Sequence, residues 1–149
     1  MIWIVFITAF VICVTIVIIG MKGVPRTLES IYGPMNDLLK RGYDGGFLLI
    51  NISNTKRFLQ VRKYINAPGK YGIELAFPKA PWSIPYFDSV CALCDRNGQP
   101  YTIAQDKFNG PLSFLYADFG KDVEKAFFMI REILIKTMGV SENDKLFCD

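Results

Sequence analysis

The chain has 149 residues, enough for one compact domain, and about 125 residues remain once its apolar N-terminal segment is set aside. Hydrophobic residues make up 51% of the sequence and charged residues 21%, which excludes a disordered chain. The net charge is only +3 and basic residues are interspersed with acidic ones, so no nucleic-acid partner is predicted. The chain has no histidine, which removes the commonest general base and the commonest metal ligand.

The N-terminal segment is uncharged over residues 2–20 and is close to the ~20 apolar residues that cross about 30 Å of hydrocarbon. The sequence therefore predicts a transmembrane anchor over residues 1–21 and one domain over residues 22–149. A cleaved signal peptide is the alternative, but it would need a basic n-region and a small-residue cleavage site, which are both missing. Lys22 and Arg26 closely follow the span, so we expect a single-pass protein of the bacterial inner (plasma) membrane with its C-terminal domain in the cytoplasm.

In the first part of the domain, the sequence predicts one helix and three strands. The Val24-Pro25 pair is typical of a helix start, and apolar residues at three- and four-residue steps continue to residue 41. The Gly33-Pro34 pair threatens to kink this helix, and the segment GYDGG ends it. Strand-like runs then predict an antiparallel meander over residues 47–52, 57–65 and 71–77.

In the second part of the domain, the sequence predicts a helix, two strands and a last helix. Prolines forbid regular structure in residues 77–85, and a short helix is expected over residues 85–95. Strands are expected over residues 101–105 and 112–119, and a C-terminal helix over residues 121–138. The predicted fold is therefore α+β, with an N-terminal transmembrane helix followed by an α-β-β-β-α-β-β-α domain whose antiparallel sheet is covered by helices.

Four segments resemble a known group: FLLINI, RFLQV, YGIELAFP with a helix after the proline loop, and FLYADFGKDVEKA before the last helix. Over roughly residues 25–139 the chain resembles the type III secretion chaperone-like superfamily, often called TY-Chap. The resemblance implies a twisted antiparallel sheet covered by helices and a domain that binds other polypeptides without catalysis. Secretion chaperones of this fold are usually soluble homodimers, so the apolar leader departs from the pattern and argues against an ordinary export role. Related domains also occur beside toxin genes, which by analogy implies an immunity role.

Two groups of side chains are candidates for contact with a partner. One face of the second predicted strand carries Phe58, Gln60, Arg62 and Tyr64. Such a mixture of aromatic, amide and guanidinium groups suits peptide recognition, and the alternative is a helix-covered face with a snorkelling arginine. Trp82 lies in a proline-flanked loop, where it is either an aromatic anchor for a partner or a lid over the sheet edge.

The remaining motifs do not predict a chemical site. Cys91 and Cys94 form a CxxC pair, but without a second pair or a histidine the zinc ligand set is incomplete. Both thiols are better interpreted as small buried apolar groups of an amphipathic helix. Asp44-Gly45-Gly46 and Gly120-Lys121-Asp122 lack the spacing of a phosphate loop or a catalytic motif. The sequence therefore predicts no enzyme, no cofactor and no metal.

These observations favour a membrane-anchored protein-binding module of the secretion-chaperone-like type, serving as an immunity or adaptor protein. Its expected polypeptide partner is either a toxin or a secretion component. It is also expected to contact the lipid bilayer through residues 2–20. The sequence does not decide whether the domain forms a homodimer. One alternative is a structural accessory subunit that organises a membrane complex. The other is a thiol-redox protein that uses Cys91 and Cys94.

Overall fold

The computed structural model describes residues 23–105 and 110–149. Its strands are, in chain order, β1 (Val24–Arg26), β2 (Phe47–Ile52), β3 (Phe58–Ala67), β4 (Lys70–Pro78), β5 (Thr102–Gln105), β6 (Ser113–Gly120) and β7 (Leu146–Cys148). Its helices are η1 (Glu29–Ile31, 3-10), α2 (Tyr32–Arg41), α3 (Ile84–Arg96), α4 (Val123–Glu132) and η2 (Ile133–Thr137, π-helical). The described strands form one antiparallel sheet in the order β1-β7-β2-β3-β4-β6-β5.

The central strands alternate between buried and partly exposed side chains, as expected of a sheet with one packed face. Leu59 and Val61 of β3 are fully buried, and Val61 lies opposite Leu75 of β4 in the register. The β3–β4 connection is a tight turn that contains Gly69 at φ 74°, a conformation that glycine adopts without a steric penalty. The alternation therefore fixes which face of each strand is turned towards the core.

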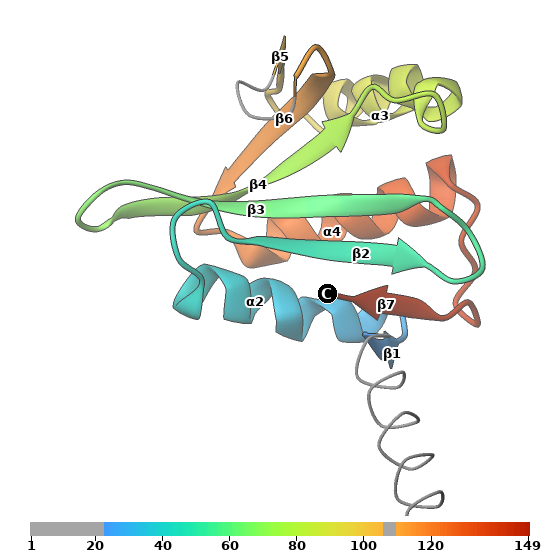
Figure 1. The fold of residues 1–149 in the computed structure, drawn as a ribbon, viewed down its shortest axis with the longest axis horizontal. Coiled ribbons are helices and arrows are strands. Elements are labelled where there is room, and N and C mark those ends of the chain that lie inside the picture. The colour runs from blue at the N-terminus through green and yellow to red at the C-terminus, as the bar shows by residue number, and fades with distance from the viewer. Residues whose placement is uncertain (1–22, 106–109) are drawn as a thin grey trace, which may run out of the picture.

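The helices cover that packed face of the sheet (Figure 1), where α4 lies behind β3 in the view. Buried side chains of α2, α3 and α4, such as Met35, Phe87 and Ile130, belong to the same hydrophobic cluster as Leu75 and Phe77 of β4. Burying a large aliphatic or aromatic side chain stabilises a fold by about 1.5–3 kcal/mol relative to leaving it in water. The core between the sheet and the helices is therefore the main source of stability.

A lysine side chain lies inside this packed layer, beside the C-terminus of α2. Lys63 of β3 is only 5% exposed, and its Nζ donates a hydrogen bond to the Leu39 carbonyl at 2.6 Å. The free carbonyl groups at the C-terminus of a helix favour a cation. The Tyr71 ring, 5.0 Å from the same Nζ, provides a second favourable contact.

The predicted element order is wrong in two places within the described residues. Val24-Pro25 does not start a helix, because β1 pairs with β7 and the helical segment begins only at Glu29. The strand β7 was not predicted, and it lies between β1 and β2 in the sheet. The Gly33-Pro34 pair does not split the helix, because it lies in the first turn of α2, where proline is tolerated.

The predicted transmembrane helix is the other part of the fold that needs correction. Among the residues that the structure describes, no helix is both long and apolar enough to cross a membrane. The span predicted for residues 2–20 lies outside the described residues. Within the described part of the chain, the fold is an α+β domain with a seven-stranded antiparallel sheet and three α-helices, and none of these helices is a membrane span.

Candidate functional site

The side of the sheet opposite the helices is lined by strand side chains, and we call it the open face. It consists of Phe47, Leu49 and Asn51 of β2, Phe58, Gln60, Arg62 and Tyr64 of β3, Gly72, Glu74 and Ala76 of β4, Tyr116 and Asp118 of β6, and Thr102 of β5. The α-helices α2, α3 and α4 pack on the other side of the sheet. None of these three helices covers the row on β3, which was the alternative interpretation of that row. The row from Phe58 to Tyr64 runs about 20 Å along β3, the length of an extended peptide of about six residues.

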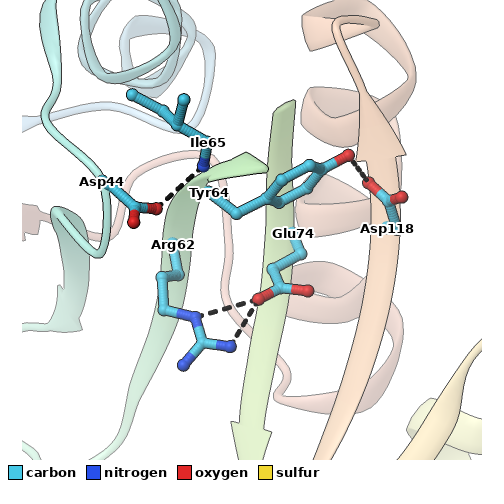
Figure 2. A network of polar contacts seen from close by, with 6 residues as sticks. All are labelled: Asp44, Arg62, Tyr64, Ile65, Glu74 and Asp118. Atoms are coloured by element: carbon cyan, nitrogen blue, oxygen red, sulfur yellow. Dashed lines mark hydrogen bonds and ion pairs between the residues drawn. The ribbon is translucent and has the colours of Figure 1, made fainter. Parts of the chain in front are cut away.

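Arg62 is held in one position by its neighbour in the β3–β4 register, Glu74 (Figure 2). Its Nε and Nη2 both donate to Glu74 Oε1, at 2.9 and 2.6 Å. Its guanidinium also lies 5.0 Å from the centre of the Tyr116 ring. Because the side chains of this pair are only 31% and 15% exposed, it is less screened by water than an ordinary surface pair. The face therefore presents an ordered guanidinium group.

Tyr64 of β3 is held in place by Asp118 of β6, which lies beyond β4 in the sheet (Figure 2). The Tyr64 hydroxyl donates to Asp118 Oδ1 at 2.8 Å, and the same oxygen accepts from the Gly120 backbone N–H at 2.7 Å. Burial, and then the hydrogen bond to Asp118 and its negative charge, raise the pKa of Tyr64 to about 12. Tyr64 is therefore a neutral hydrogen-bond donor at physiological pH.

Trp82 lies at the other end of the row and serves as a packing residue there. Its ring centre is 5.1 Å from that of Phe58 and 5.9 Å from that of Phe77. The loop that carries it is closed by Ser83, whose Oγ accepts a hydrogen bond from the Ala80 N–H at 2.8 Å and contacts the Pro78 carbonyl. The half-buried indole thus links the end of the open face to the core.

The structure brings the predicted residues into two groups. Trp82 and Phe58 form one group, while Arg62 and Tyr64 lie further along β3, with Gln60 between the two groups. Sequence reasoning missed the three residues that order the second group: Glu74, Tyr116 and Asp118. The alternation of β4 placed Glu74 on the face away from Ile73 and Leu75, but the register that sets it beside Arg62 joins distant segments.

The surroundings of the cysteine pair disfavour the thiolate form. Burial raises the pKa of the Cys91 thiol, and burial is also the main cause that raises the pKa of Cys94 to about 11. A thiol is nucleophilic and metal-binding as the thiolate, which both shifts disfavour at neutral pH. Within residues 23–105 and 110–149, no group of histidine, cysteine, aspartate or glutamate side chains could hold a metal ion.

Comparison of the chain with family models, with curated proteins and with solved structures gives no match. The resemblance to the TY-Chap superfamily therefore stays a prediction based on the sequence, and the geometry of the open face is the basis for a functional proposal.

Proposed function

We propose that this domain binds a polypeptide partner through the open face. The observation that supports this best is the row on β3, where Arg62 and Tyr64 are each ordered by a carboxylate before any partner arrives. Side chains that are already ordered lose less conformational entropy when a partner docks. Tyrosine and arginine are also enriched among the residues that contribute most to binding at interfaces.

The partner class follows from the resemblance to secretion chaperones, which bind other polypeptides without catalysis. On this basis the partner is a toxin or a secretion component, and the domain acts as an immunity or adaptor protein. An accessory subunit that only organises a complex is the alternative. It would dock through the helix layer, where Tyr32 contacts Phe127 edge to face and Phe128 is 51% exposed.

Membrane localisation is a separate part of the proposal and rests on the sequence alone. Residues 2–20 carry no charged side chain, so the segment is stable in an apolar environment. Basic residues such as Lys22 follow it, which favours a cytoplasmic position for the domain. Fractionation of cells that produce the full chain tests this, with an alkaline wash to strip peripheral proteins. Recovery of the uncleaved chain from the soluble fraction would contradict it.

Two exposed phenylalanines on opposite sides of the domain allow a matched test of the binding surface. Phe47 lies opposite Arg62 in the β2–β3 register, on the open face, and is 52% exposed. Phe128 of α4 is 51% exposed on the helix layer. A photoreactive phenylalanine analogue is placed at either position in the full chain, and cells are irradiated. We expect a polypeptide adduct from position 47 that is not formed from position 128.

The outcomes separate the two candidate functions. An adduct from position 128 alone would support an accessory subunit that docks through its helices. Arg62→Lys keeps the charge but loses the two-nitrogen contact with Glu74 Oε1, so it should weaken the adduct from position 47. The matched control is Arg41→Lys, since Arg41 forms an ion pair with Asp37 in which the side chains are 81% and 58% exposed. Equal adducts from both positions would overturn the proposal.

A further inference from the structure

A polar pocket lies on the open face, at the end of β2 that is far from Phe47. It has a volume of about 420 Å³, and its lining includes Asn51, Ser53 and Asn54 from the end of β2 and the turn after it. The lining also includes Phe147 of β7 and Asp149, the residue after β7. Because β7 lies beside β2 in the sheet (Figure 1), we call this site the β7 pocket.

The sheet register places the β7 pocket beside the row on β3. Asn51 lies opposite Phe147 of β7 on one side and opposite Phe58 of β3 on the other. Residues that lie opposite one another share a face of the sheet, so Phe147 extends the open face beyond β2. Asp149 exchanges two backbone hydrogen bonds with Leu49 of the same face, at 2.9 and 3.0 Å, which fix its position. The pocket is therefore continuous with the surface that we propose for the partner.

The carboxylate of Asp149 has one oxygen available to a ligand. Its Oδ2 accepts a hydrogen bond from Asn51 Nδ2 at 2.8 Å. Within residues 23–105 and 110–149, its Oδ1 accepts no hydrogen bond and Asp149 forms no ion pair. A Cβ at Gly23 would collide with Oδ1, so this oxygen lies against Gly23, which is another lining residue. Because Asp149 is exposed, a group that enters the pocket can reach this oxygen.

The other groups of the pocket are suited to the N–H donors of a cation. The side-chain carbonyls of Asn51 and Asn54 and the hydroxyl of Ser53 can each accept a hydrogen bond. The Phe147 ring adds the electron-rich surface to which cations are attracted. Among the described residues of the lining, Asp149 alone carries a formal charge, and this charge is negative. The pocket therefore favours a positively charged group.

The position of the pocket selects a long basic side chain. Neighbouring strands lie about 4.8 Å apart, so an extended segment that lies over β2 is displaced sideways from β7 by about this distance. Lysine and arginine side chains are longer than this spacing, and their apolar stems can lie over Phe147 while the charged end reaches Asp149. Lys56 and Lys145, the described lysines closest to the pocket in sequence, are exposed and do not line it. The carboxylate is therefore open to a cation from the partner.

We propose that the partner polypeptide inserts a lysine or arginine side chain into the β7 pocket, where its charged end binds Asp149 Oδ1. This proposal rests on the proposed function and specifies the partner as an extended segment with a basic residue beside the part that contacts Phe58. A hydrogen bond between charged groups is roughly twice as strong as one between neutral groups, so the pocket prefers a basic residue to a neutral one. An acidic residue at the same point would be repelled.

Photocrosslinking from inside the pocket tests this in cells that produce the full chain. A photoreactive phenylalanine analogue replaces Phe147, which keeps an aromatic ring in the lining. We expect a polypeptide adduct, and mass spectrometry of its digest should place a lysine or arginine of the partner beside the attachment point. A polypeptide adduct without a basic residue there would overturn the proposal. A lipid adduct would also overturn it and would assign the pocket to a lipid headgroup.

The crosslinked segment, prepared as a synthetic peptide, then measures the contact with the full chain in detergent. Replacing its basic residue by norleucine, which keeps an apolar stem and removes the charge, should weaken binding by about tenfold. Asp149→Asn keeps an acceptor for Asn51 Nδ2 but removes the charge, so in this variant the norleucine effect should fall to about threefold or less. Asp88→Asn, at an exposed position of α3, removes the same charge elsewhere and should leave the tenfold effect unchanged. A norleucine effect that persists in Asp149→Asn would overturn the proposal.

The remaining outcomes separate this proposal from the proposed function. An adduct from position 47 without one from position 147 would overturn the pocket assignment and leave the open face as the binding surface. The absence of an adduct from both positions would overturn both proposals.

Discussion

The aromatic ring of Tyr64 occupies the space in front of Gly72, its partner in the β3–β4 register. A Cβ at Gly72 would lie 2.5 Å from Tyr64 Oη and 2.7 Å from Gly120 Cα. Glycine is therefore required at this position by the close approach of two neighbouring strands. Because Gly72 has no side chain, the Tyr64 side chain can cross β4 there and its hydroxyl reaches Asp118 of β6 (Figure 2).

Replacing Gly72 by alanine should destabilise the domain by about 1–3 kcal/mol, because the added methyl group must displace the tyrosine and a backbone segment. The free energy of unfolding from urea titration measures this. Gly33→Ala is the matched control, since a Cβ at Gly33 meets nothing within 4 Å and the residue lies in α2. The control should be stabilising by up to about 1 kcal/mol. Equal losses in both variants would contradict the close approach at Gly72.

The pH dependence of stability should report on Tyr64. Its folded pKa is about 12 and its ordinary value is 10.0, so the folded state holds the phenolic proton more firmly than the unfolded state. The resulting stabilisation is complete below pH 10.0 and is lost as the pH rises towards about 12. Tyr64→Phe has no such proton and lacks this part of the loss.

Urea unfolding of the two proteins at about pH 9 and about pH 11.5 provides the comparison. Between these conditions the wild type should lose more stability than Tyr64→Phe, while the other tyrosines contribute equally to both. Asp118→Asn should show an intermediate loss, because it removes the negative charge and keeps a hydrogen-bond acceptor. Parallel losses in the wild type and Tyr64→Phe would contradict the assigned pKa.

Local sequence patterns predicted the elements that have a clear apolar periodicity or clear turn residues at their ends. The strand over residues 47–52 was predicted with its observed bounds, and α3 within one residue at each end. β1 and β7 could not be predicted in this way, because each has three residues and their pairing joins Val24 to Cys148. Strands that short contain no measurable alternation and depend on a distant partner. The turn of π-helix after α4 has no signal in the apolar periodicity either.

Local sequence patterns also predicted only part of the candidate site. The alternation within β3 predicted that Arg62 and Tyr64 share a face, which the structure confirms. The carboxylates that order them come from β4 and β6, and their positions depend on a sheet register that local patterns do not contain. The edge position of β5 also depends on the strand order, which is a property of the whole sheet.

Trp82→Ala should destabilise the domain by about 2–4 kcal/mol, because the indole fills the space between Phe58 and Phe77. The midpoint of urea unfolding measures this loss. Ile84→Ala, two residues along and 57% exposed, should change stability by less than about 0.5 kcal/mol. Trp82→Phe keeps an aromatic ring against Phe58 and should recover part of the stability. A stable Trp82→Ala protein that fails to form the adduct at position 47 would instead assign the indole to partner binding.

The buried thiol of Cys94 should be inert in the folded protein. Its side chain is fully buried and burial raises its pKa to about 11, so the reactive thiolate is strongly disfavoured at neutral pH. In a Cys91→Ser variant, labelling of Cys94 by N-ethylmaleimide, followed by mass spectrometry, should begin only at urea concentrations that unfold the domain. The half-buried Cys148, whose pKa is also raised to about 11 by burial, is the internal comparison in the same experiment. Rapid labelling of Cys94 in native buffer, or a reversible disulfide between Cys91 and Cys94 in the wild type, would contradict the inert thiol and favour the thiol-redox alternative.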